Sequence, residues 1–230
     1  MSIKIKNGDS NAKSTQSEEK EIQIISKGLN SSEEIEIDSI WLERPTMRIA
    51  LISIFTALTV VMGYALAYIP NVELFTMMNF LSGFLLGKKN GAIIGAMSGF
   101  IFCFFNPLGA TALPLLSYQI FHYSFVGFLG AISHNFLSNR NFFKPEDDLY
   151  VFPVLLFFGI IGFLITLTYD ILSSLVDSYF LFGTLDAFIP YLISGLFFTT
   201  IHEIGNTLVF IFILPGTIQI SYKLLDIKNE

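Results

Sequence analysis

The chain is built from long apolar segments that follow one another with only short polar interruptions. Six such segments can be outlined, at residues 47–69, 73–87, 91–109, 113–135, 150–176 and 187–214. A helix needs about 20 residues to cross the hydrocarbon core of a bilayer, and most of these segments approach or exceed that length. The second is short, and Glu73 and Asn79 dilute it. The pattern predicts an all-α integral membrane protein, a bundle of six transmembrane helices.

Composition supports a multi-pass protein of the cell membrane. Hydrophobic residues make up 53% of the 230 residues and charged residues only 14%. Soluble domains usually carry about 25% charged residues, so too few polar side chains are present here to cover a surface that faces water. The excess apolar side chains must therefore face lipid or other helices.

The distribution of basic residues predicts that both termini are cytoplasmic. Lys and Arg in short loops mark the cytoplasmic side of a membrane protein. With the N-terminus inside, six spans place every Lys and Arg on the inner side. The charged residues of the outer loops are then all acidic, namely Glu73, Asp177 and Asp186. A miscount by one helix would mix the two sets.

The chain divides into three parts by composition. Residues 1–45 are polar and acidic and are predicted to form a disordered cytoplasmic tail, with Trp41 as an interfacial anchor near its end. This tail lacks the apolar core of a secretory signal. Residues 46–215 form the membrane domain, and residues 216–230 a short cytoplasmic C-terminal tail.

Small residues at four-residue spacing predict close helix packing. On the first helix, Ser53 and Ala57 form such a pair, and glycines repeat in the same way at positions 83, 87, 91, 95 and 99. Packing inside the bundle explains most of these positions. For Ser53 and Ala57, a docking face for a second membrane protein is an equal alternative.

Polar side chains at membrane depth are costly, so each is expected to face a cavity or a polar partner. The set comprises Asn79, Asn106, Gln119, His122, Asp170, His202, Glu203 and Asn206. Three predicted helices, the fourth to the sixth, could bring them together around a small polar ligand that enters from outside. The alternative is that they bond to one another and only hold the bundle together. Counting from the predicted helix ends places Asp170 in the outer half of the bilayer, and His202 and Asn206 nearer the middle or the inner half.

Several catalytic and binding motifs are lacking. The segment His202-Glu203-Ile204-Gly205-Asn206 carries Asn where the HExxH zinc motif has its second histidine. The single cysteine, Cys103, lies in an apolar run and is expected to be a buried thiol, which excludes an intramolecular disulfide and a thiolate zinc cluster. No phosphate loop or basic nucleic-acid face is present, so neither ATP hydrolysis, a metal, a cofactor nor nucleic acid is expected.

The order of these features resembles the substrate-binding S component of energy-coupling factor (ECF) vitamin transporters. The stretches that carry the resemblance are residues 68–74, 83–87, 91–95, 105–109, 118–119, 169–172 and 202–206. Together with the number and size of the spans, they cover essentially the whole membrane domain.

The resemblance implies a function and partners. Such S components bind a vitamin or related micronutrient at the extracellular side and associate with a transmembrane coupling subunit and two ATPase subunits. The implied ligand contacts are Asn71, Glu73, Asn106, Gln119, His122 and Asp170, with His202 and Asn206 as deeper candidates. Ser53 and Ala57 match the family's AxxxA docking pattern with Ser in place of the first Ala. No activity as an enzyme is expected, because ATP hydrolysis belongs to the partners.

Two other classes of function stay open at this point. One is an intramembrane enzyme that uses His202 and Glu203 as an acid–base pair, and the other is a structural membrane scaffold. The vitamin itself is not specified by the sequence. Tyr118, Tyr169 and Tyr179 could stack on a flat ring, and the acidic outer side argues against a strongly anionic ligand.

Overall fold

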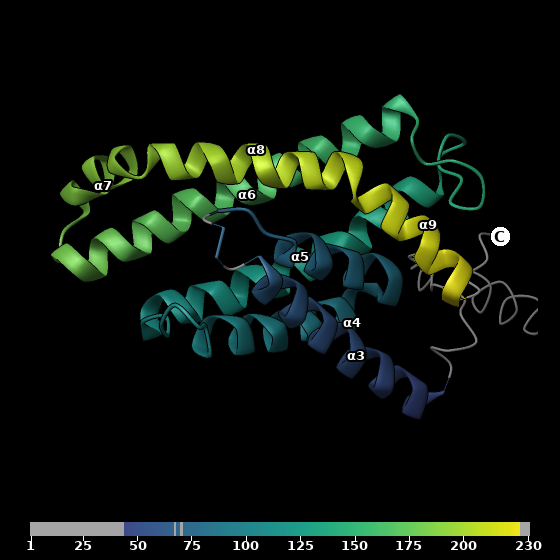
Figure 1. The fold of residues 1–230 in the computed structure, drawn as a ribbon, viewed down its shortest axis with the longest axis horizontal. Coiled ribbons are helices and arrows are strands. Elements are labelled where there is room, and N and C mark those ends of the chain that lie inside the picture. The colour runs from purple at the N-terminus through teal and green to yellow at the C-terminus, as the bar shows by residue number, and fades with distance from the viewer. Residues whose placement is uncertain (1–43, 67, 70, 226–230) are drawn as a thin grey trace, which may run out of the picture. The chain divides into compact units, whose positions relative to one another are not determined.

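The structure, a computed structural model, describes residues 44–66, 68–69 and 71–225. These residues form helices and no strands, as expected for an all-α protein (Figure 1). The elements are α3 (Pro45–Ala65), α4 (Phe75–Phe104), α5 (Leu113–Ser138), α6 (Phe152–Phe182), the 3₁₀ turn η1 (Leu185–Ala187), α7 (Phe188–Ser194), α8 (Leu196–Phe212) and α9 (Leu214–Leu225). The predicted N-terminal tail up to residue 43, with the Trp41 anchor, lies outside the described residues.

Three of the described helices, α3, α5 and α6, are long and apolar enough to cross a membrane. Residues 185–194 (η1 with α7) and α8 are apolar and long enough only when taken together, and they are inclined by 66° to each other across a short break. If they count as one bent span, the number becomes four. The prediction of a multi-pass helical membrane protein agrees with this result at the level of helix length and composition.

Helix α4 is a hairpin of two antiparallel arms, Phe75–Leu86 and Lys88–Phe104. The break falls at Gly87, whose φ of 84° and ψ of 170° no helix can contain. The Oγ of Ser98 donates to Oδ1 of Asn79 at 2.7 Å, although 19 residues separate the two. In a straight helix these residues would be about 28 Å apart. The chain therefore reverses direction at Gly87, where the second apolar segment ends.

The first arm of α4 forms the centre of the bundle. Every residue from Phe75 to Leu86 is buried, so no face of this arm is left for lipid. An arm of this length spans about 18 Å, well short of the roughly 30 Å of the hydrocarbon core. Its rings make edge-to-face contacts with neighbouring helices, for example Phe80 with Phe158 and Phe210. The arm is a core element around which the longer helices pack.

Glycines allow the two arms of α4 to pack directly against α5. A Cβ on Gly83 would lie 1.6 Å from the carbonyl oxygen of Gly127, and one on Gly95 would lie 2.0 Å from that of Tyr123. Backbone atoms at these distances leave no room for any side chain. The four-residue glycine spacing predicted close packing, and its partner is α5.

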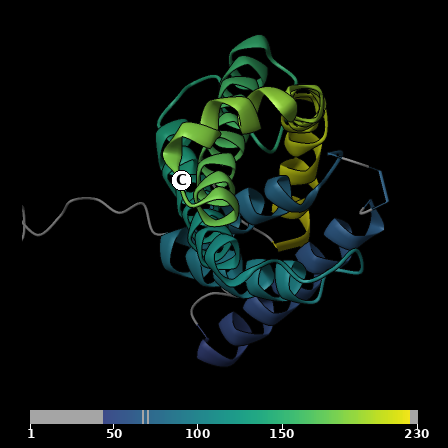
Figure 2. The same ribbon diagram turned by 90° about the vertical axis from the view of Figure 1, so that its left-hand side faces the viewer.

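Helices α6 and α8 lie side by side along one side of the bundle, with η1 and α7 forming the connection at one end (Figure 1). Figure 2 views the molecule from that end. The predicted fifth span stops at residue 176, but α6 continues to Phe182, where Gly183 ends it in the left-handed conformation with a φ of 72°. This extension of about 9 Å changes the depth of every polar residue that was counted from the helix end.

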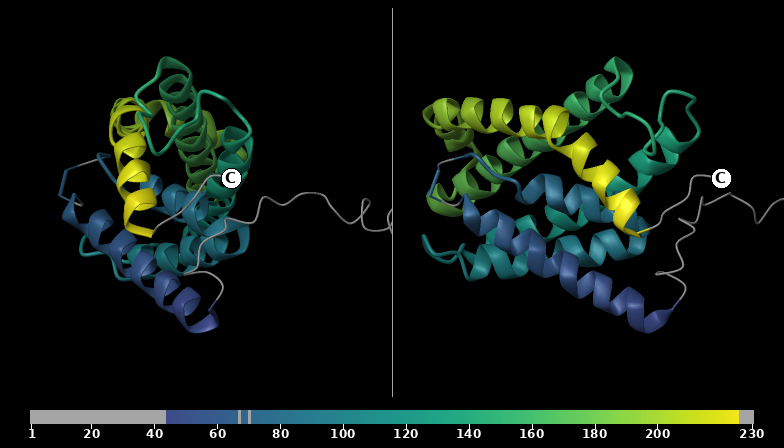
Figure 3. Two further views of the ribbon diagram at one scale, coloured as in Figure 1. Left: turned by 90° about the vertical axis from the view of Figure 1, so that its right-hand side faces the viewer. Right: turned by 45° about the vertical axis from the view of Figure 1, so that its right-hand side comes forward.

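A short helix, α9, follows α8 after a bend and inclines across the end of the bundle, where it contacts α4 (Figure 3). Leu214, Ile218 and Tyr222 are buried, and the Tyr222 hydroxyl lies 2.8 Å from Nε2 of His134 on α5. The segment predicted as a C-terminal tail from residue 216 is thus helical as far as Leu225 and belongs to the packed core.

Candidate functional site

A cavity of about 210 Å³ lies where α3 ends, between the loop 66–74 and helices α4, α5, α6 and α8. Five of the predicted ligand contacts line it: Asn71, Glu73, Asn106, Asp170 and His202. The rest of the wall consists of Gly63, Leu66, Ile69, Val72, Phe102, Tyr123 and Tyr169. The lining therefore combines polar and charged side chains with aromatic and aliphatic ones.

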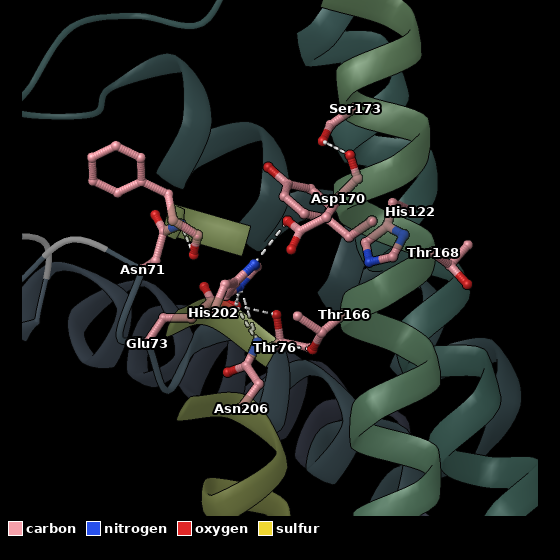
Figure 4. A network of polar contacts seen from close by, with 12 residues as sticks. Asn71, Glu73, Thr76, His122, Thr166, Thr168, Asp170, Ser173, His202 and Asn206 are labelled. Carbon is pink, nitrogen blue, oxygen red and sulfur yellow. Dashed lines mark hydrogen bonds and ion pairs between the residues drawn. The ribbon is translucent and has the colours of Figure 1, made fainter. Parts of the chain in front are cut away.

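The imidazole of His202 lies between two carboxylates in the lining of this cavity (Figure 4). Its Nδ1 is 2.9 Å from Oδ1 of Asp170 on α6, and its Nε2 is 3.4 Å from Oε1 of Glu73 in the loop before α4. Only about a tenth of the His202 and Asp170 side chains is exposed. A doubly protonated ring can donate from both nitrogens, so an imidazolium satisfies both carboxylates together.

Polar side chains from α4 and α6 surround the Glu73 carboxylate and Asn206 (Figure 4). The hydroxyl of Thr76 donates to Oε1 of Glu73, and Nδ2 of Asn206 donates to the same oxygen at 3.3 Å. Asn206 Nδ2 also lies 3.1 Å from Oγ1 of Thr166. Burial opposes ionisation of Glu73, but the hydrogen bonds and the charge of His202 lower its pKa below the usual value. Glu73 is thus held as an anion.

The loop that carries Glu73 is fixed to α8 by Asn71. The Asn71 Nδ2 donates to the carbonyl oxygen of Phe198 at 2.7 Å. Asn71 also has a φ of 58°, in the left-handed region that Asn tolerates better than most residues. This conformation turns the chain just before Glu73 and directs the loop across the end of the bundle.

Gln119 and His122 on α5 lie behind the cavity wall. The Gln119 Nε2 donates to the hydroxyl of Tyr169 at 2.9 Å, and the rings of His122 and Tyr169 have centroids 5.0 Å apart. Tyr169 itself lines the cavity, with Tyr118 stacked near it at 6.1 Å. Both predicted contacts therefore act on the position of Tyr169 in this structure.

Asn106 lines the cavity from the loop between α4 and α5. Its Oδ1 accepts a hydrogen bond from the backbone N–H of Leu108 at 2.9 Å, which forms an Asx-type turn. Asn106 thus shapes the loop as well as the cavity edge.

The difference in depth expected between Asp170 and the pair His202 and Asn206 was wrong. Counting from predicted helix ends separated them from Asp170, whereas the structure places His202 in contact with Asp170. The extra turns at the end of α6 set Asp170 further from that end than expected, and the two helices then match in depth. Asn206 follows one turn below His202 and joins the same network.

Three residues of the site were missed from the sequence: Thr76, Thr166 and Tyr123. Thr166 lies four residues before Asp170 on α6, and Thr76 lies three residues after Glu73, so helical spacing could have found both. Tyr123 is adjacent to His122, but the sequence contains so many aromatic residues that nothing distinguished this one. None of the three is ionised at neutral pH, which is why a search for charged side chains passed over them.

Some buried polar atoms at the site have no hydrogen-bond partner among the described residues. They include Oδ2 of Asp170, Oε1 of Gln119 and Nε2 of His122. Both carboxylate oxygens of Glu203 on α8 also have no hydrogen-bond partner among the described residues, but Glu203 does not line the cavity. Within residues 44–225 as described, no group of His, Cys, Asp and Glu has a geometry suited to a metal ion.

Ser53 and Ala57 lie on the exposed face of α3. The opposite face, with Phe55, Thr59 and Gly63, packs into the bundle. The Ser53 hydroxyl donates to the carbonyl oxygen of Ile49 at 3.0 Å, one turn earlier on its own helix. Both small residues are therefore accessible on a surface free for lipid or for another membrane protein.

In comparisons with known proteins, no family model, curated protein or solved structure matches this chain.

Proposed function

We propose that this chain is the substrate-binding S component of an ECF-type importer of the cell membrane. It captures a vitamin or related micronutrient from outside, and a transmembrane coupling subunit with two ATPases drives uptake. The observation that carries this proposal is the cavity at the end of α3, because five predicted contacts line it and the other three support its walls.

The position of the basic residues supports an extracellular opening. All seven Lys and Arg residues of the described segments occur at the start of α3, around Gly87, after α5 or in α9. These places lie at the end of the bundle opposite the cavity, whose lining includes Gly63 near the end of α3, Glu73 just before α4 and Asn106 just after it. Basic residues mark the cytoplasmic side, so the cavity faces outward.

The six-span topology with cytoplasmic termini is part of the same proposal. The two arms of α4 supply the second and third segments, and α7 with α8 supplies the sixth. The first arm is too short to span a bilayer alone, but all its residues are buried by the surrounding parts of the bundle. It therefore needs no contact with lipid.

Features of the site favour binding over the two alternatives. An enzyme that used His202 and Glu203 would need both groups near its substrate, but only His202 lines the cavity. A scaffold would use its polar groups to bond to one another and would have no need for a cavity beside them. A cavity is present instead, and Asp170, which lines it, keeps one carboxylate oxygen without a hydrogen-bond partner among the described residues.

The test is binding by the purified protein in detergent, screened by thermal shift against vitamins and their precursors. A ligand at 100 times its dissociation constant stabilises the folded state by about 2.7 kcal/mol, which raises the melting temperature visibly. A hit should also be taken up by cells that express the chain with a coupling subunit and ATPases. No shift for a folded protein across a broad panel would reject the proposal.

Docking is tested by enlarging the small face of α3. Ala57→Leu should reduce uptake without changing ligand binding, because Ala57 is exposed and far from the cavity lining. Val61→Leu on the same helix is the matched control, since Val61 is a larger residue that is already 61% exposed. Equal uptake by both variants would exclude docking through Ala57.

A further inference from the structure

We propose that the cavity selects a small organic cation with a flat ring, held by the carboxylates of Asp170 and Glu73 and by the aromatic residues of the lining. The inference deepens the proposed function, on which it rests for the role of the ligand as imported cargo. It can be tested by binding alone.

The charge of the cavity lining favours a cationic ligand. Two carboxylates and one imidazole line the cavity, and no Lys or Arg of the described residues contributes to it. Even with His202 as an imidazolium, the lining keeps one negative charge in excess. An unpaired charge away from water is costly, and a cationic ligand would compensate it. An anionic ligand would add to the imbalance.

The hydrogen bonds of Asp170 also favour a cationic ligand. Asp170 is 8% exposed and lines the cavity, yet only its Oδ1 is bonded, to His202. Its Oδ2 has no hydrogen-bond partner among the described residues. Asp170 lines the cavity, so an N–H group of a ligand there would lie beside a carboxylate whose hydrogen bonds are incomplete among the described residues. Because the acceptor is charged, a cationic donor forms the stronger hydrogen bond.

The lining also contains three aromatic side chains. Phe102, Tyr123 and Tyr169 line the cavity from α4, α5 and α6. Phe102 is fixed by stacking on Phe75 with centroids 4.4 Å apart, and Tyr169 by its hydrogen bond to Gln119. Aromatic rings attract cations over their faces and stack on flat groups. This part of the lining is therefore rigid and suited to a planar cation.

The volume of the cavity favours a small ligand. The cavity of about 210 Å³ has the volume of about seven molecules of liquid water. Pockets for drug-sized ligands usually measure about 300–1,000 Å³. A single substituted ring is the size of occupant that this volume suits.

The test uses three probes of nearly identical shape and different charge: benzamidine, benzamide and benzoate. Binding to the purified full chain in detergent is measured at pH 7 by thermal shift and by isothermal titration. Benzamidine is a cation at this pH and should bind at least tenfold more tightly than benzamide, while benzoate should not bind. Equal binding of the three probes, or a preference for benzoate, would overturn the inference.

Two variants connect the preference to the carboxylates. Asp170→Asn should weaken benzamidine binding about 10- to 100-fold, the usual effect of losing a hydrogen bond to a charged group. Its matched control is Asp177→Asn on the same helix, which makes the same change outside the cavity lining and should bind as the unchanged chain does. If Asp170→Asn does not fold, Glu73→Gln takes its place. Full binding by a folded Asp170→Asn variant would overturn the role of Asp170.

The outcomes separate this inference from the proposed function. If a neutral or anionic vitamin binds tightly and is taken up, the charge preference is wrong and the transport function stands. If benzamidine binds with the expected preference but no vitamin is taken up with the partner subunits, the cation site stands and the transport function is wrong.

Discussion

The Nδ1 of His202 and the Oδ1 of Asp170 lie 2.9 Å apart, although 32 residues separate them in the chain. The pair joins α8 to α6 at the depth of the cavity, and Glu73 approaches the other nitrogen of the same ring. The three side chains form one unit, in which removal of the central imidazole leaves two carboxylates facing each other.

Replacing His202 by Ala is expected to destabilise the protein strongly. Breaking a buried ion pair by removing one partner typically costs about 3–5 kcal/mol, since the remaining charge stays buried. The double variant His202→Ala/Asp170→Ala should lose less than the sum of the single variants, because the unpaired Asp170 is removed as well. Melting temperatures of the four proteins in detergent measure this coupling. Additive losses would show that the two residues do not interact.

The hydrogen bond between Ser98 and Asn79 is expected to hold the α4 hairpin closed. Ser98→Ala leaves Oδ1 of buried Asn79 without its donor, which typically costs about 1–3 kcal/mol. In membrane proteins such couplings are often smaller, about 0.6 kcal/mol on average, so a double-mutant cycle with Asn79→Ala is the suitable measurement. Ser117→Ala is the control, because Ser117 is exposed and bonds only within its own helix. A destabilisation by Ser98→Ala no larger than that by Ser117→Ala would argue against the hairpin contact.

Gly127→Ala is expected to prevent folding or to lower the melting temperature severely. The added Cβ would lie 2.2 Å from the carbonyl oxygen of Gly91, and a backbone atom cannot move aside as a flexible side chain can. The control is Gly195→Ala, where the nearest atom would be 3.7 Å away and φ is −86°. Yield of monodisperse protein and melting temperature report the result. Similar behaviour of the two variants would contradict the close approach of α4 and α5.

The stabilising effect of Glu73 should depend on pH. Its pKa is lowered in the folded protein by hydrogen bonds that outweigh burial, so its contribution is present above the unfolded pKa of about 4.3 and is lost as pH falls through the folded value. His202, Asp170, Thr76 and Asn206 are the polar neighbours of the carboxylate and its network. The difference in melting temperature between the unchanged chain and Glu73→Gln should therefore be larger at pH 7 than below pH 4. Glu146→Gln, at an exposed loop position, is the control and should show no such trend.

The orientation of the cavity can be tested by labelling single cysteines. The natural cysteine, Cys103, is 3% exposed and can be replaced by Ala to give a background without thiols. Asp186 and Lys89 are both exposed, near opposite ends of the bundle. In intact cells a membrane-impermeant maleimide should label Asp186→Cys and not Lys89→Cys, and inverted vesicles should give the reverse. The opposite pattern would place the cavity on the cytoplasmic side.

The sequence was sufficient for features that depend on local composition. Apolar runs predicted the helices, because the apolar character of a segment is a property of the chain itself, and the second run ends at Gly87, where α4 breaks. Glycine spacing likewise indicated which helix faces would pack closely. The polar residues at membrane depth were recognised because each is costly unless it has a partner.

Only the tertiary structure decided which of these residues meet. Contacts between His202 and Glu73 join positions 129 residues apart, and their existence depends on where α6 ends and on the loop fixed by Asn71. An error of six residues at one helix end displaces a side chain by about 9 Å, which is more than the reach of a hydrogen bond. Hydropathy locates helices to within a turn or two, whereas a binding site requires side chains from several helices to match in depth and direction. The charged residues of the site, Glu73, Asp170 and His202, were therefore found from the sequence, and their arrangement around one cavity came from the packing of α4, α5, α6 and α8.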